Sequence, residues 1–472
     1  MANDFLPYDL RQLYLLPPDI REWLPEKHLA RFMIEVLDEL DLSELMLVYL
    51  RTDERGRRGY HPRMLLSLLL YGYCTGTRSS RQIEKKTHED VAYRVLSCNE
   101  HPDHDTIADF RQRHLSVIAK LFGQVLRLCQ EAGLVKLGTI SIDGTKMKAN
   151  ASKHKAMSYG RMTETEARLE AEVKAILAEA AATDAQEDAR FGKGKRGDEL
   201  PDEWARRETR LKKIRAAKAA LEQEARQKAE QQAAEAKVKN EERQRKEEKR
   251  GKKAAGRPAK EPNPDEAKPE DKAQRNFTDP DSRIMKDGTS KSFEQCYNAQ
   301  AAVDGGSQII VATALTQQVN DKKQLVPMVI KTIEQTGQRP DTVLADAGYY
   351  SAAAVTDVKL TGINVLVPPD RQKHGAAGEQ PIKPAPQADP IIVAMREKLR
   401  PGTAGRELYK QRKAVVEPVF GQIKEARGIR RFSFRGLEKV TAEWDLICLT
   451  HNLLKLFRSE RAIHGGGCVS TA

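Results

Sequence analysis

The chain has 472 residues, a length that predicts two or three domains with a sizeable hydrophobic core. Lys and Arg number 80 against 68 Asp and Glu, and the net charge of +12 fits either a polyanionic partner or simple solubility. No apolar run reaches the roughly 18–20 residues of a membrane span, no signal peptide is visible, and six dispersed cysteines argue against a disulfide framework or a C-x-x-C zinc site. We therefore expect a soluble, cytoplasmic protein.

Residues 1–136 are rich in Leu and predict a helical N-terminal domain. The spacing of a buried helix face is followed by Leu65, Leu66, Leu69, Leu70 and Tyr73. A second helix is expected from Ser80 to Ser97, and a third is expected to begin at Asp105, whose side chain can cap it. The turn that joins these two helices resembles that of a helix-turn-helix motif, although plain helical bundles contain similar pairs.

A strand and a long insertion follow. Ile140 and Ile142 alternate with polar residues, which predicts a strand that ends at Asp143. Residues 152–276 then predict a helical-hairpin insertion, with two long helices and a joint near residues 192–201. Within it, the charged stretch 239–274 has few apolar residues to offset the entropy of ordering, so we expect that stretch to be disordered.

Strands and helices alternate after the insertion. Residues 295–315 predict a β-hairpin that turns at 304–306, and a helix follows with Asp321 and Gln324 as its capping pair. Next come a strand that ends on Asp346, a second apolar strand, a loop over 368–405 and a last basic helix pattern. This order predicts an α/β (α+β) domain, a mixed sheet with helices on both faces.

Three acidic residues have positions suited to catalysis. Asp143 and Asp346 each end a predicted strand, and Glu417 lies on a helix in an otherwise basic and apolar stretch. If the strands are parallel neighbours, their ends meet, and carboxylates there would suit Mg²⁺ or Mn²⁺. Two such ions about 3.5–4 Å apart would serve phosphodiester cleavage. The alternative is that both aspartates are ordinary turn residues.

Several blocks in order resemble the DDE transposases of bacterial insertion sequences. The blocks SIDGTKMKANAS, FEQCYNAQAAVD, VLADAGYYS and YKQRKAVVEPVFGQIK resemble the catalytic blocks of that family, and the block PDHDTIADFRQRH resembles its N-terminal helical domain. The resemblance implies an RNase H-like, retroviral-integrase-like core over 137–151 and 277–460, a DNA-recognition domain over 1–136 and a flexible tail over 461–472. It also implies that Asp143, Asp346 and Glu417 form a catalytic triad that binds Mg²⁺ or Mn²⁺, with two ions.

The same resemblance implies a function and partners. Such an enzyme binds the terminal inverted repeats of its element, cleaves DNA by two-metal-ion hydrolysis and joins the freed 3′-OH ends to target DNA. We expect a homodimer on double-stranded DNA, in a bacterial cytoplasm and associated with the nucleoid. The alternatives are a non-catalytic DNA-binding regulator, descended from a transposase that decayed or was domesticated, and a nuclease on the same core.

Basic residues predict where DNA binds. Between Arg396 and Arg435, twelve Lys or Arg residues stand against four acidic ones, so most of the net charge lies around Glu417. The Y-R-E-K signature of these enzymes maps partly, because the interval from Arg412 to Glu417 is one residue too long and Lys413 competes with Arg412. Pro418 should start or kink the helix. The predicted DNA contacts are Tyr409, Arg412, Lys413, Lys424, Arg427, Arg430, Arg431, Arg78, Arg81, Lys85 and Lys86, with a solvated basic face as the alternative.

Two other groups have structural interpretations. A zinc site is conceivable among His101, His104, Asp105, Asp109 and His114, but Asp105 fits a helix cap better. Cys448 and His451 lie on one side of the final helix, and we expect both to be buried in the core.

Overall fold

The computed structural model describes residues 19–47, 59–191, 202–250, 257–286, 292–370 and 389–459. The predicted joint at 192–201 and tail at 461–472 lie outside this part of the chain. Two compact units are formed, one by 1–147, 298–434 and 438–472, and the other by 148–297 with 435–437. None of the described helices is long and apolar enough to cross a membrane.

The N-terminal part of the first unit is helical, as predicted. Its helices are η1 (Ile20–Trp23), α1 (Leu29–Glu39), α2 (Ser43–Leu47), α3 (Pro62–Thr75), α4 (Ser80–Glu89), α5 (Val91–Leu96) and α6 (His104–Glu131). The predicted apolar face is confirmed, because all five of its residues are buried in α3. The helix expected over 80–97 is two helices, since the carboxylate of Asp90 accepts from Ala92 N at 2.9 Å and starts α5. Asp103, not Asp105, caps α6 through Thr106 N at 2.7 Å.

A mixed sheet forms the centre of the first unit. Its strands are β1 (Thr139–Lys148), β5 (Phe293–Asp304), β6 (Ile310–Thr316), β7 (Thr342–Ala345) and β8 (Asn364–Leu366). β1, β7 and β8 are parallel neighbours, β5 lies on the other side of β1, and β6 pairs antiparallel with β5. The predicted hairpin is therefore confirmed. The prediction that β1 ends at Asp143 is wrong, because the strand continues for five residues beside the long β5.

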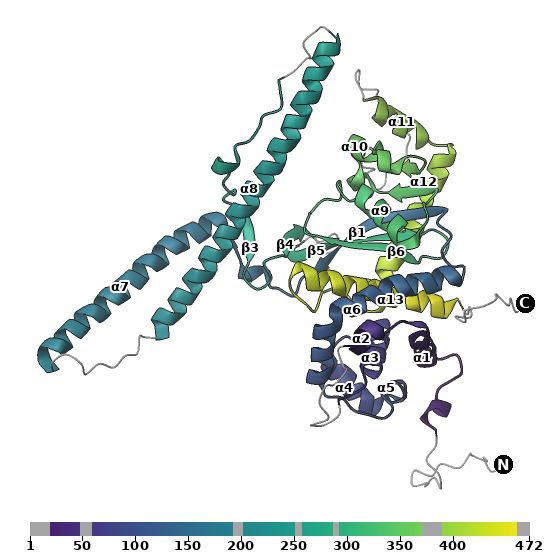
Figure 1. Ribbon diagram of the computed structural model, residues 1–472, viewed down its shortest axis with the longest axis horizontal. Coiled ribbons are helices and arrows are strands. Elements are labelled where there is room, and N and C mark those ends of the chain that lie inside the picture. Colours follow the sequence, from purple (N-terminus) through teal and green to yellow (C-terminus); the bar gives the residue numbers. More distant parts are fainter. Residues whose placement is uncertain are drawn as a thin grey trace, which may run out of the picture. The chain divides into compact units, whose positions relative to one another are not determined.

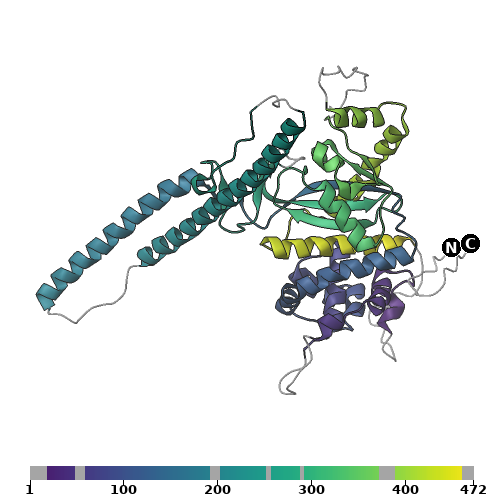
Figure 2. The same ribbon diagram turned by 45° about the horizontal axis from the view of Figure 1, so that its top comes forward.

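The remaining helices of this unit include α9 (Leu325–Thr336) and α12 (Ala404–Gly421), which contact the strands β6 and β7, respectively. The others are η4 (Ala347–Tyr349), α10 (Ala352–Val355), η5 (Val358–Leu360), α11 (Pro390–Lys398), the π-helix η6 (Gln422–Ala426) and α13 (Leu437–Arg458). α6 and α13 run side by side along the sheet (Figures 1 and 2), where the indole of Trp444 donates to Gln300 O at 3.0 Å. The expected loop over 368–405 contains α11, which Asp389 caps and Pro390 begins.

The second unit contains the two long helices α7 (Tyr159–Phe191) and α8 (Asp202–Arg250), shown in blue and teal in Figure 1. They contact each other through an apolar cluster formed by Met162, Leu169, Leu211, Ile214, Ala217 and Leu221. The unit also contains η2 (Lys153–Lys155), β2 (Ala156–Ser158), η3 (Pro264–Glu266), β3 (Gln274–Asn276) and β4 (Arg283–Lys286). β2 pairs with β3, and β4 pairs with residues 293–296 of β5.

The prediction of disorder over 239–274 is wrong for its described residues. α8 continues to Arg250, and the chain from residue 257 returns along it. The side chain of Asn240 binds the backbone of Ala259 twice, at 2.8 and 3.0 Å, and Arg226 pairs with Asp265 at 3.0 Å. Polar contacts to α8 thus hold this segment, whose composition offers little apolar burial.

Candidate active site

Asp143 and Asp346 lie on neighbouring parallel strands at the same level of the sheet. Ile142 pairs with Ala345 at the end of the β1–β7 ladder, so the two aspartates are the next residues on each strand. Asp346 leaves the sheet here and caps η4, because its Oδ1 accepts from Gly348 N at 2.9 Å. The pairing register of β1 and β7 therefore brings Asp143 and Asp346 together, as predicted.

The charges of this acidic pair interact. Burial and the charge of Asp346 raise the pKa of Asp143 to about 6, against the opposing effect of Arg412. Arg412 Nη1 donates to Asp143 Oδ2 at 3.1 Å, and the side chains of the arginine and the aspartate are 10% and 20% exposed. Burial disfavours the charged guanidinium, yet the nearby acids hold the pKa of Arg412 above its ordinary value. The acidic pair is thus a concentration of negative charge that the guanidinium of Arg412 partly offsets.

Arg412 and Tyr409 both lie on α12, which extends toward the acidic pair. Ser141 Oγ donates to Arg412 O at 3.4 Å, which ties the helix to β1. Tyr409, one turn earlier, packs against the apolar cluster of Leu344 and Leu366, and burial together with the charge of Asp346 raises its pKa. Arg412 is therefore brought to Asp143, and Tyr409 lies one turn earlier on the same helix.

Glu417 is placed differently. It is exposed on α12, and five residues after Arg412 a helical side chain points about 140° away from it. In the described part of the chain, no group of three or more His, Cys, Asp or Glu side chains could hold a metal ion. The structure therefore brings together two of the three predicted acids.

The helix does not start at Pro418, which lies inside α12, one turn before the π-helical residues of η6. That residue has no N–H to donate to Ala414 O, and Gln308 Nε2 fills the vacancy at 2.9 Å from the hairpin between β5 and β6. α12 thus continues, and η6 follows as one π-helical turn. From η6, Lys424 Nζ donates to Lys146 O at 2.8 Å, three residues beyond Asp143 on β1.

Asp321 is a further acidic residue beside the pair, and its sequence pattern predicted only a helix cap. Asp321 does not cap α9, because its Oδ1 accepts from Asn298 Nδ2 at 2.6 Å and from Gln300 Nε2 at 2.7 Å. Both amides are fully buried on β5, and the hydroxyl of Tyr349 donates to Gln300 Oε1. The sequence could have indicated this network, since the amides of Asn298 and Gln300 stand at alternate positions of one strand and point to the same face.

The predicted DNA contacts divide into exposed and buried residues. Exposed side chains are Lys413, Arg430, Arg431, Arg81 and Lys85, while Lys86 is partly buried over the ring of Tyr93. Arg427 was predicted to contact DNA, but its side chain is buried. It is 6% exposed, it donates to Thr450 Oγ1 at 2.9 Å and to Ile447 O at 3.3 Å, and burial lowers its pKa to about 10. Arg78 also has a partner within the protein, because its Nη1 donates to Arg431 O at 2.7 Å.

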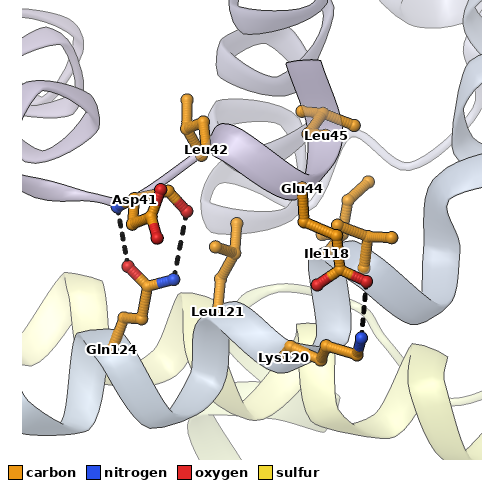
Figure 3. A pocket seen from close by; sticks show the side chains of 9 residues that line it. Asp41, Leu42, Glu44, Leu45, Ile118, Lys120, Leu121 and Gln124 are labelled. Atoms are coloured by element: carbon orange, nitrogen blue, oxygen red, sulfur yellow. Dashed lines mark hydrogen bonds and ion pairs between the residues drawn. The ribbon is translucent and has the colours of Figure 1, made fainter. Parts of the chain in front are cut away.

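Neither the suspected zinc site nor the pocket shown in Figure 3 has the features of a ligand-binding site. His104 Nδ1 contacts Glu84 Oε2 at 2.9 Å and His101 contacts Thr87, so the suspected zinc ligands have other partners. The pocket in Figure 3 lies between α6 and the segment around α2, where Gln124 binds the backbone of Asp41. Its volume of about 30 Å³ is that of one water molecule, so it is a packing gap. Cys448 and His451 are buried, as predicted.

Two protein-family models match the chain. One, described as a transposase DDE domain, matches residues 269–453, and the other, described as a transposase domain (DUF772), matches residues 18–113. The first match contains Asp321, Asp346, Arg412 and Glu417, whereas Asp143 lies in the interval between the two matches. The comparison with curated proteins gives no match, and neither does the comparison with solved structures.

Proposed function

The chain belongs to the DDE transposases of insertion sequences, and we propose that it performs the complete reaction of such an enzyme. It binds the terminal inverted repeats of its own element, cleaves DNA by two-metal-ion hydrolysis and joins the freed 3′-OH ends to target DNA. It acts as a homodimer on double-stranded DNA in a bacterial cell, because two element ends must be held together.

The order of the strands supports an RNase H-like core. In the six-stranded sheet β4 also pairs with β5, and the remaining strands have the order β6-β5-β1-β7-β8, with a β5–β6 hairpin on one side of β1 and two parallel strands on the other. α9 makes the connection from β6 to β7. The helical insertion leaves this core between β1 and β5 and returns without interrupting the parallel pair. In this proposal the N-terminal helices recognise the element's ends.

The observation that carries the proposal is the acidic pair of Asp143 and Asp346. Two carboxylates at adjacent ends of parallel strands supply hard oxygen donors. The pKa of Asp143 is raised mainly by burial and further by the charge of Asp346, and a bound cation would stabilise both charged carboxylates. These donors fit Mg²⁺ or Mn²⁺, and two ions would activate the attacking oxygen and stabilise the leaving oxygen of a phosphodiester. Glu417 is the proposed third ligand from its place in the family's block, on the helix that already contacts β7.

The basic side chains act on the DNA backbone. Lys413, Arg430 and Arg431 are exposed and available to phosphates, and Lys424 reaches β1 next to the acidic pair. Arg412 holds Asp143 and carries positive charge toward the position of the scissile phosphate. Because these contacts are electrostatic, DNA affinity should fall steeply with salt concentration.

The test is incubation of the purified protein with DNA that carries the ends of its element, in Mn²⁺, with scoring of cleavage and strand-transfer products. Asp143→Asn, Asp346→Asn and Glu417→Gln should each abolish both products and retain DNA binding, whereas the exposed control Glu334→Gln should keep both. Cleavage without transfer would favour the nuclease. Binding without cleavage by the wild-type chain would favour the regulator, and cleavage by Asp143→Asn would refute the site.

A further inference from the structure

Asp321 is an acidic residue without a role in the proposed triad, yet it is held more tightly than a surface carboxylate. Two amide donors, from Asn298 and Gln300, converge on its Oδ1 at 2.6 and 2.7 Å. The amides are fixed in turn, since Gln300 Nε2 also donates to Asn298 Oδ1 at 3.1 Å and Asn298 Nδ2 to Gln318 O at 3.1 Å. Bonds from buried amides to a charged acceptor are among the stronger hydrogen bonds of a protein.

This amide–carboxylate network lies directly against the acidic pair. A Cβ atom at Gly144, the residue after Asp143, would lie 2.3 Å from Gln300 Nε2 and 3.0 Å from Asp321 Oδ1. On the other strand, a Cβ at Gly348 would lie 2.9 Å from Asp346 Oδ1 and 3.7 Å from Asp321 Oδ2. Both glycines therefore give the network room to approach the two catalytic aspartates.

Tyr349 connects the same groups. Its hydroxyl donates to Gln300 Oε1, and its ring is fully buried at the end of η4, which Asp346 caps. Its pKa lies well above the ordinary value because of burial and then because of the charges of Asp321, Asp143 and Asp346. One phenol thus experiences all three carboxylates, which places Asp321 in the electrostatic field of the pair.

We propose that Asp321 is a positioning residue of the transposase site. It fixes the buried amides that support the backbone at Gly144, and its charge favours divalent cations at Asp143 and Asp346. It acts through its neighbours, because its Oδ1 already accepts from both buried amides. This inference rests on the proposed function, because it assigns Asp321 to the same metal-dependent reaction.

Mn²⁺ binding to the metal-free full-length chain, measured by calorimetry, tests the role of the charge. Asp321→Asn preserves the shape and removes the charge, and Asp321→Ala removes both. Each variant should bind Mn²⁺ about tenfold more weakly, the order expected for the loss of one unit charge several ångströms from a partly buried cation. Asp321→Glu, which keeps the charge, should restore part of the affinity, and the exposed control Glu334→Gln should bind as the wild type does.

The same samples separate a positioning role from a purely structural one. Unchanged Mn²⁺ affinity in either charge-removing variant that folds, with a lower melting temperature as its only effect, would overturn the inference. Asp143→Asn identifies the cause of a failure. If this variant loses Mn²⁺ binding while the Asp321 variants keep it, only the role of Asp321 is wrong. If Asp143→Asn binds Mn²⁺ like the wild type, the proposed metal site itself is wrong.

Discussion

Glu443 on α13 is a fully buried carboxylate whose removal should strongly destabilise the first unit. Its Oε2 accepts from Ser433 N at 2.8 Å and from Phe434 N at 3.1 Å, and its Oε1 accepts from the hydroxyl of Tyr73 at 3.4 Å. Arg78 Nη1 lies 3.6 Å from the same Oε1. One side chain therefore connects α3, the segment after η6 and α13.

The magnitude follows from these partners. Glu443→Gln keeps the volume but removes the charge and replaces one acceptor oxygen with an NH₂ donor that faces other donors. Two hydrogen bonds to a charged group are worth about 1.5–3 kcal/mol each. Breaking a buried ion pair from one side costs about 3–5 kcal/mol, and Arg78 is mostly buried. Since these contributions overlap, we expect a total loss of about 3–5 kcal/mol in the free energy of unfolding.

The assay is urea unfolding followed by the fluorescence of Trp444, the next residue, together with hydrogen exchange at the amides of Ser433 and Phe434. In Glu443→Gln, both amides should lose protection with the global transition. The matched control is Glu438→Gln, an exposed change in the first turn of α13, which should cost less than about 1 kcal/mol. A loss below 1 kcal/mol for Glu443→Gln would refute the reasoning, because the buried carboxylate would then contribute no more than the exposed one.

Three further predictions concern the site and its supports. Gly144→Ala should abolish strand cleavage and retain DNA binding in a gel-shift assay, because the new Cβ would lie 2.3 Å from Gln300 Nε2. Gln308→Ala should lower the free energy of unfolding by about 0.5–1.5 kcal/mol in urea, because Ala414 O would lose the donor that replaces the missing N–H of Pro418 and would bind water instead. Burial lowers the pKa of His451 from 6.5 to about 3, so its contribution to stability should be complete above pH 6.5 and lost as the pH falls toward 3; His451→Gln should flatten this acid limb of the melting temperature against pH.

Periodicity made the strands and the buried helix face predictable, because burial repeats along a regular element. The end of β1 was not predictable from the polar residue Asp143, since partner strands determine where a strand ends. β5 has 12 residues and β1 has 10, so pairing continues past the parallel ladder with β7. The helix starts after Asp90 and Asp103 were not predictable either, because only coordinates show which acidic side chain reaches a free N–H.

The role of Asp321 shows a different limit of sequence reasoning. An aspartate followed three residues later by Gln324 at the start of a helix has the pattern of a cap, and that local interpretation was physically sound. The carboxylate instead meets Asn298 and Gln300, more than 20 residues earlier in the chain, because the turn after β6 returns it to β5. A contact made across a sheet competes with a local cap, and only the fold decides between them.

Net charge has the same limit when it is used to locate a DNA-binding surface. The stretch around Glu417 holds most of the excess charge, but its arginines have different surroundings in the structure. Arg427 uses its guanidinium to hold carbonyl and hydroxyl groups of α13, and Arg412 faces Asp143, whereas Arg430 and Arg431 remain exposed. Substituting Arg427 should therefore reduce stability, while substituting Arg431 should reduce DNA affinity and its salt dependence. Only the exposed basic side chains of this stretch are available to DNA. The buried ones stabilise the fold, as Arg427 does, or pair with an acid of the site, as Arg412 does.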